Sequence, residues 1–143
     1  MRQGELTTLS SPDMAAANAY ALRVAEAVGA TVVDATSPTD IDRVLDEIGD
    51  AMKVVVIGGG LQCVRGPHPW VTVGEAFRKL RQLAYLANRA VMVVVRESKG
   101  GSTPTKVYYS ASATIMRSAD TAIRVVDGRP RAVKYRSAHP IFY

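Results

Sequence analysis

Apolar residues along this chain follow the periods of two kinds of element. Continuous apolar runs at 54–57 and 90–95 are typical of strands buried on both faces of a parallel sheet. Shorter strands are predicted at 4–11 and 30–35, and residues 71–89 are predicted to form the longest helix.

Two further helices are predicted from a shared start signal, a serine followed by a proline. Ser11 fits an N-cap, Pro12 fits the first helical position, and Gly29 fits the end of the first of these helices. Ser37 and Pro38 repeat the signal before the second helix. The apolar positions at helical spacing in that helix are Ile41, Val44, Leu45 and Ile48.

Turn residues separate the remaining elements. Segments 63–70 and 98–106 are predicted to be loops, because they are rich in proline and glycine. Asp127–Gly128 indicates a tight turn between two strands at 121–126 and 129–137. Strands that alternate with helices predict an α/β fold, as one domain over residues 1–143: a mostly parallel sheet with helices on both faces, extended at one edge by the hairpin.

Composition narrows the class of protein. A chain of 143 residues, 48% of them hydrophobic, is long enough to bury a sizeable core. The single Cys63 excludes an internal disulfide and a cysteine-rich metal site. Neither a membrane-length apolar run nor a signal-peptide pattern is present, so a cytoplasmic location without membrane partners is expected.

The net charge of +5 hides an asymmetry between the two parts of the chain. Residues 1–50 hold three Arg against nine Asp or Glu, a balance of −6, whereas residues 51–143 hold fifteen Lys or Arg against four, a balance of +11. A basic half favours a polyanionic partner, most simply nucleic acid. The alternative is that the acidic face of one copy docks on the basic face of the next.

Catalytic motifs are absent from the sequence. The stretch "GGGLQCVRG" at 58–66 follows a strand, but it lacks the lysine and hydroxyl of a GxxxxGK[ST] phosphate loop. In the segment 98–105, Lys99 precedes the glycines instead of following them. His68 and His139 both neighbour prolines, and neither accompanies a nucleophile. The sequence therefore predicts no catalytic residue, no metal site and no cofactor.

Several stretches in one order resemble a known family. "AFRKLRQLAYLANRAVMVVVRESKGG" and "SADTAIRVVDGRPRAVKYRSAHP" look like a helix, strand, loop and closing hairpin of the RecA/RadA-like ATPase core, and the resemblance spans residues 5–140. Ser118–Ala119–Asp120 and Lys134–Tyr135–Arg136 match its "hsADvvlrl…R…KnRfgp" run most closely. The resemblance implies a trimmed RecA-like core.

The departures from that family imply an inactive ATPase homologue. By this resemblance the phosphate-loop segment would precede residue 1, the paired glutamates fall on Ser10 and Ser11, and the Walker B aspartate falls on Gly58. The polar sensor position becomes Arg96 or Glu97. Serines cannot act as a general base for water at neutral pH, and a glycine cannot hold a hydrated Mg²⁺. The resemblance thus implies that the glycines mark a nucleotide site that has lost its catalytic groups.

The resemblance also implies where DNA would bind, because in this family the loops corresponding to 63–70 and 96–106 face DNA. Basic groups and hydroxyls suit phosphate contacts, and a tryptophan suits stacking on a base, although ordinary solvated loops are the alternative. The candidate nucleic-acid-binding residues are Arg65, His68, Trp70, Arg96, Lys99, Ser102, Thr103 and Lys106. Lys134 and Arg136, which in active members of the family reach a neighbour's nucleotide, would contact DNA, an acidic helix of a neighbour, or solvent.

The sequence-based hypothesis is a non-catalytic RecA-like protein that binds DNA as an accessory of recombination, repair or replication. One alternative is a regulator that acts by protein contact alone, of the SulA and ImuA kind, with a RecA-family or repair protein as partner. Another is a subunit that completes an ATPase with a partner supplying the phosphate loop. The apolar tail at 137–143 covers a sheet edge or docks on a partner.

Overall fold

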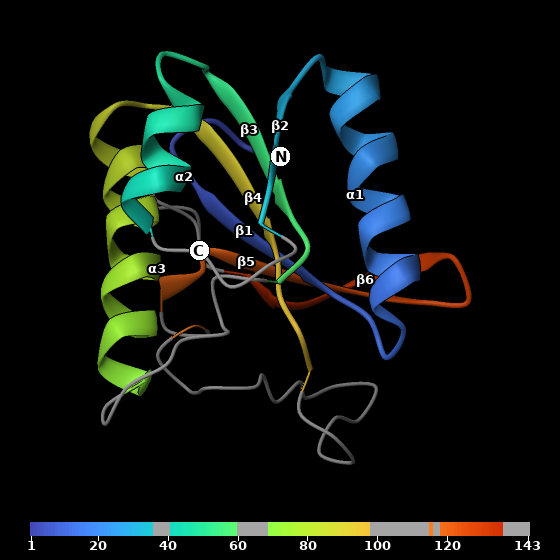
Figure 1. The fold of residues 1–143 in the computed structure, drawn as a ribbon. Helices are drawn as coiled ribbons and strands as arrows, with labels where there is room; N and C mark the ends of the chain where they lie inside the picture. Colours follow the sequence, from blue (N-terminus) through green and yellow to red (C-terminus); the bar gives the residue numbers. More distant parts are fainter. Residues whose placement is uncertain (36–40, 60–68, 98–114, 116–117, 136–143) are drawn as a thin grey trace.

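The computed structural model describes residues 1–35, 41–59, 69–97, 115 and 118–135 (Figure 1). The strands are β1 (Leu6–Ser10), β2 (Thr31–Asp34), β3 (Lys53–Ile57), β4 (Ala90–Val94), β5 (Thr121–Val126) and β6 (Arg129–Tyr135). The helices are α1 (Met14–Val28), α2 (Ile41–Ile48) and α3 (Pro69–Leu86). Within these ranges, no helix has the length and apolar character needed to cross a membrane.

The described strands form one six-stranded sheet in the order β2-β3-β4-β1-β5-β6. Every neighbouring pair is parallel except β5 and β6, which form an antiparallel hairpin. The predicted α/β class, with a mostly parallel sheet and a hairpin at one edge, is confirmed. The first strand along the chain lies in the centre of the sheet, between two strands from the second half.

Helices cover both faces of the sheet, α1 on one face and α2 with α3 on the other (Figure 1). Alternate residues of each central strand enter opposite cores. In β3, Val55 packs with α1, whereas Val54 and Val56 pack with α2 and α3. The same alternation holds for β4, where Met92 faces α1 and Val93 faces α3. Burial on both faces explains why these strands are continuous apolar runs.

The helix starts differ from the sequence prediction at two places. The N-cap of α1 is Asp13 instead of Ser11, because the Asp13 carboxylate accepts a hydrogen bond from the Ala15 amide. The predicted end at Gly29 is confirmed, with φ 69° in the left-handed region. Helix α3 begins at Pro69, so that Trp70 belongs to a helix and not to the predicted loop. Proline is favoured in a first helical turn, where its missing N–H costs nothing.

The closing hairpin turns at the predicted Asp127–Gly128 pair. Both residues have positive φ, 52° and 75°, as a tight two-residue hairpin turn requires. Strand β6 forms the edge of the sheet and contains Pro130, which an edge strand tolerates because one side of its backbone needs no partner. Ser37 and Pro38, the predicted start of α2, lie outside the described residues.

Candidate functional site

The carboxyl ends of the parallel strands meet at one edge of the sheet, where ligands of open α/β folds bind. Strand β1 ends there at Ser10, β3 ends at Ile57 before Gly58, and β4 leads to Arg96 and Glu97. The four positions assigned to an emptied ATPase site, Ser10, Ser11, Gly58 and Arg96 or Glu97, thus lie at the end of a strand or directly after it. These strand ends form the carboxyl edge of the sheet.

In the connection between β1 and α1, the carboxylate of Asp13 caps the start of the helix. The Ser11 hydroxyl accepts a hydrogen bond from the Asp13 amide at 3.2 Å, and the Asp13 carboxylate accepts one from the Ala15 amide at 3.0 Å. An anion that binds at a helix start is held by the free backbone amides of the first helical turn and by their positive field. Asp13 uses one of the amides and adds a negative charge, so this helix start disfavours phosphate.

The glycines after β3 form a turn that only glycine adopts readily. Gly58 and Gly59 have φ 98° and 72°, in the region that L side chains rarely occupy. The Gly58 amide donates a hydrogen bond to Oδ1 of Asn18 at 2.9 Å, which ties the end of β3 to α1. Backbone geometry and the Asn18 contact therefore explain these two glycines. Gly60 lies outside the described residues.

A buried ion pair between Glu97 and Arg124 lies at the carboxyl edge, where the chain leaves β4. Nε of Arg124 lies 3.2 and 3.0 Å from the two oxygens of Glu97, and Nη2 lies 3.0 Å from Oε1. The exposed fraction is 12% for the Arg124 side chain and 6% for that of Glu97. Arg124 is also the register partner of Ser10, whose buried hydroxyl has no hydrogen-bond partner. Glu97, one of the two predicted sensor positions, thus pairs with Arg124 and ties the chain after β4 to β5. Arg96, the other position, is exposed.

Arg124 is not among the site residues predicted from the sequence. A signal for it exists, because it is the one charged residue in the strand Thr121–Val126, and a charge in a buried strand requires a partner. The spacing along the chain could not name that partner, since Glu97 lies 27 residues earlier.

Asp120 of the matched Ser118–Ala119–Asp120 stretch has a structural position, at the amino end of β5. Its carboxylate accepts a hydrogen bond from the Leu6 amide at 2.9 Å, and its own amide donates to the Leu6 carbonyl at 2.8 Å. Nη2 of Arg81 on α3 lies 3.4 Å from the same carboxylate. Asp120 therefore joins β5 to β1 and to α3, at the amino ends of these strands and away from the carboxyl edge.

Most of the predicted nucleic-acid-binding residues fall on parts of the chain that the structure does not describe. For Trp70 and Lys134 the backbone alone is described, in the first turn of α3 and in β6. Those that lie outside the described residues are Arg65, His68, Lys99, Ser102, Thr103, Lys106 and Arg136. Their grouping into one surface stays a prediction.

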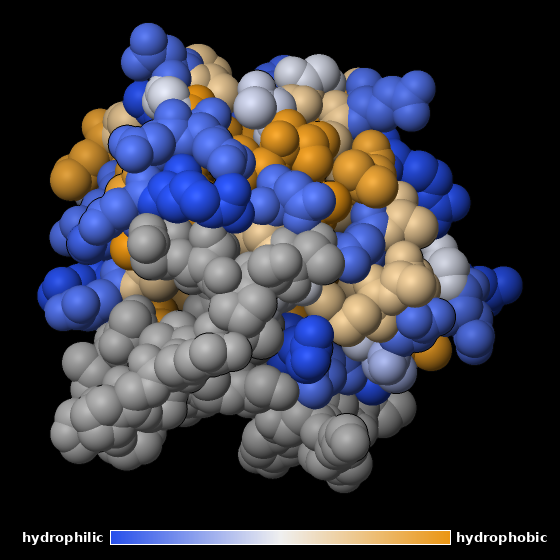
Figure 2. Space-filling view, in the orientation of Figure 1, coloured by the Kyte–Doolittle hydropathy of each residue, from blue (hydrophilic) through white to orange (hydrophobic). Residues whose placement is uncertain are grey.

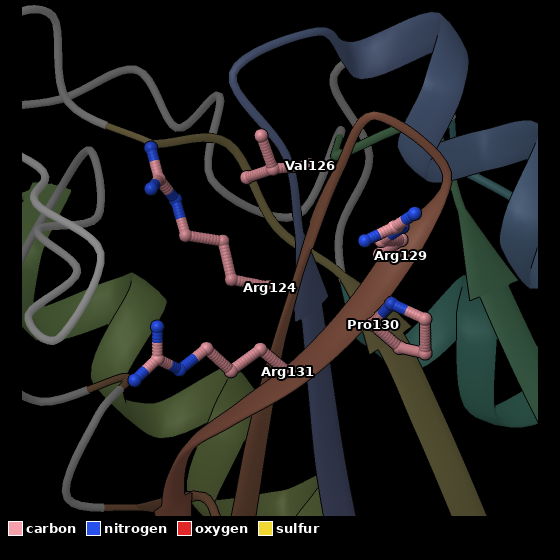
Figure 3. Close-up of a pocket in the computed structure, with 5 residues that line it drawn as sticks. All are labelled: Arg124, Val126, Arg129, Pro130 and Arg131. Atoms are coloured by element: carbon pink, nitrogen blue, oxygen red, sulfur yellow. The ribbon is translucent and has the colours of Figure 1, made fainter.

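The closing hairpin carries a basic cavity that the sequence analysis did not single out. Its volume is about 400 Å³, and Figure 3 shows its described lining residues, Arg124, Val126, Arg129, Pro130 and Arg131. Arg131 lies opposite Arg124 in the antiparallel register, and Arg129 lies opposite Val126. The signal in the sequence is the pair of arginines two positions apart directly after the turn, because alternate residues of a strand share a face.

The acidic charge of the first fifty residues is partly paired within the chain. On α2, Asp42 lies 3.5 Å from Nζ of Lys79 on α3, and Glu47 lies 2.6 Å from Nη1 of Arg43. Figure 2 shows hydrophilic side chains gathered over this helix. In the described ranges no three His, Cys, Asp or Glu residues come together as a metal site would require.

Comparison with known proteins identifies the fold. Neither a protein-family model nor a curated protein sequence matches this chain significantly. Among solved structures, that of the RadB recombinase is similar, with a TM-score of 0.60 over 95% of this chain and 83% of the other, at 14% sequence identity. The likeness shows the RecA-like α/β fold that the sequence resemblance implied.

Proposed function

We propose that this chain is a RecA-like protein that does not hydrolyse nucleotides and that binds DNA as an accessory of recombination, repair or replication. The observation that carries the first part is the state of the carboxyl edge. There, the helix start is capped by Asp13, Gly58 has no side chain, and Glu97 is paired with Arg124. None of these three groups is arranged to hold a phosphate or a hydrated Mg²⁺.

The strand order supports a particular counterpart for the phosphate loop. In folds of this kind a phosphate binds in the turn between a central strand and the following helix. Here the central strand is β1, and only Ser11, Pro12 and Asp13 connect it to α1. A GxxxxGK[ST] loop needs eight residues. We therefore assign this shortened turn, instead of a segment before residue 1, as the counterpart of the phosphate loop.

Calorimetry with ATP and Mg²⁺ tests the first part of the proposal. We expect no hydrolysis and no binding tighter than roughly millimolar, which is about −4 kcal/mol, because no cradle of free amides and no lysine is provided at the β1–α1 turn. Micromolar binding that depends on Mg²⁺ would overturn the inactive-site proposal.

Support for DNA binding comes from the balance of +11 over residues 51–143 and from the RecA-like fold. The test is titration of labelled single- and double-stranded DNA at several salt concentrations. If Lys99 and Lys106 contact phosphates, their replacement by Ala flattens the log–log salt slope by roughly one to one and a half units on single strands. Trp70→Ala weakens binding by about 1–3 kcal/mol with the slope unchanged, because stacking releases no counterion.

A regulator that acts by protein contact is the second candidate function, and the charge asymmetry favours it. A basic face of one copy, with Lys134 and Arg136, would meet the acidic α2 of the next copy. Such a head-to-tail contact closes a ring or extends as a filament. Light scattering at low salt and high concentration tests this association, and a monomer under those conditions would rule it out.

A further inference from the structure

We propose that the β5–β6 hairpin binds the backbone of single-stranded nucleic acid, with phosphates held by Arg129 and Arg131 at the cavity of Figure 3. This inference rests on the proposed DNA-binding function and adds to it a surface that lies outside the two loops. It names the strandedness and two contact residues, which the sequence resemblance did not.

The hairpin register places the three arginines on one face. Arg124 and Arg131 lie directly opposite each other, and Arg129 is two positions from Arg131 along β6. In Figure 3, Arg124 and Arg131 extend toward the same side of the hairpin. Val125, the neighbour of Arg124, packs in the core with α1, so the arginines face the side of the sheet that carries α3.

The charges on this face are not balanced within the described residues. Like charges directly opposite each other on two strands are unfavourable. Glu97 neutralises Arg124, whereas Arg129 and Arg131 are exposed and have no hydrogen bond or ion pair with the described part of the chain. Among the described residues, an excess of two positive charges therefore lines the cavity. A ligand with more than one anionic group, such as consecutive phosphates, satisfies both guanidinium groups.

Val126 gives the cavity an apolar floor, because it lies on the face of the arginines and is 40% exposed. Pro130, which lies between Arg129 and Arg131 along β6, is the other described apolar residue of the lining. A cavity of about 400 Å³ is within the size range of small-ligand sites. An unpaired base or its sugar can contact this floor while the phosphate reaches the arginines. The bases of a duplex are stacked inside and cannot, so the cavity favours single strands.

The hairpin face also continues the surface proposed to contact DNA. The Glu97–Arg124 ion pair joins the hairpin to the chain directly after β4, and Glu97 lies within the predicted DNA-binding segment 96–106, next to the candidate residue Arg96. A strand of nucleic acid that contacts Arg96 would thus pass next to the arginine cavity.

Fluorescence anisotropy with a labelled oligo-dT 20-mer, and with a duplex of equal length, tests the proposal. The double variant Arg129→Ala/Arg131→Ala removes two phosphate contacts and should flatten the salt slope by about 1.4 units on single strands. This corresponds to about 25-fold weaker binding at 0.1 M salt if the affinities converge at 1 M. The control Arg23→Ala/Arg78→Ala removes the same charge from exposed positions of α1 and α3 and should leave the slope within about 0.3 units.

A charge-preserving variant separates a contact from a folding defect. Arg129→Lys/Arg131→Lys keeps both positive charges and should keep the slope, with circular dichroism confirming the fold of all variants. The proposal is overturned if the alanine variant keeps the wild-type slope while the wild type binds the 20-mer, or if the duplex binds as tightly as the single strand. If the wild type binds neither DNA, the proposed DNA-binding function itself fails.

Discussion

Removing either partner of the Glu97–Arg124 ion pair should strongly destabilise the protein. Three nitrogen–oxygen contacts of 3.0–3.2 Å join the two groups, and their side chains are 6% and 12% exposed. Glu97→Met leaves a buried guanidinium without its carboxylate, and Arg124→Met leaves a buried carboxylate without its guanidinium. Breaking a buried pair in this way costs about 3–5 kcal/mol of the free energy of unfolding.

The double variant Glu97→Met/Arg124→Met provides the control, because it replaces both charges by apolar groups of similar length. Such replacements are neutral or nearly so, and we expect a free energy of unfolding within about 2 kcal/mol of the wild type. Urea denaturation followed by circular dichroism gives all four values and the coupling energy between the two sites. Single variants that each lose less than about 0.5 kcal/mol would show that solvent screens the pair, and the reasoning from burial would be wrong.

Three other contacts lead to expected outcomes. Asp120→Ala leaves the buried Leu6 amide without an acceptor and should lower the free energy of unfolding by about 1–3 kcal/mol, measured in urea; a change below about 0.5 kcal/mol would contradict the role of this carboxylate in joining β5 to β1. Asn18→Leu removes the acceptor of the Gly58 amide, whose hydrogen exchange should accelerate; unchanged exchange would mean that the turn holds without it. Phe77→Ala, at a fully buried position of α3, should cost about 3–5 kcal/mol, and a thermal shift of less than a few degrees would argue against that packing.

The sequence predicts well those features that depend on neighbouring residues. The apolar runs identify β3 and β4, Gly29 marks the end of α1, and Asp127–Gly128 marks the hairpin turn, because local backbone geometry and two-sided burial determine each. The central place of β1 could not be predicted in this way. Its pairing with β4 and β5 depends on residues far along the chain, and its sequence Leu-Thr-Thr-Leu-Ser is no more apolar than that of an edge strand.

The candidate site shows the same division. The absence of catalytic groups at Ser10, Ser11 and Gly58 is implied by the sequence resemblance and stays a prediction. The capping role of Asp13 and the pairing of Glu97 with Arg124 depend on where side chains meet in space. A lone arginine in an apolar strand signals that a partner exists, but it does not say which carboxylate is within reach.

The central position of β1 also affects how the chain folds during synthesis. Leu6 pairs with Val91, and Thr7 pairs with Thr121, so the first strand made must wait for about 114 further residues before its second neighbour exists. At the usual rates of translation this interval lasts roughly 6 to 23 seconds. Strands β2, β3 and β4 can pair as soon as residue 94 has been synthesised, but one side of β1 then remains open to pairing with other chains. We therefore expect the yield of folded protein to depend more strongly on the speed of translation after residue 94 than before it.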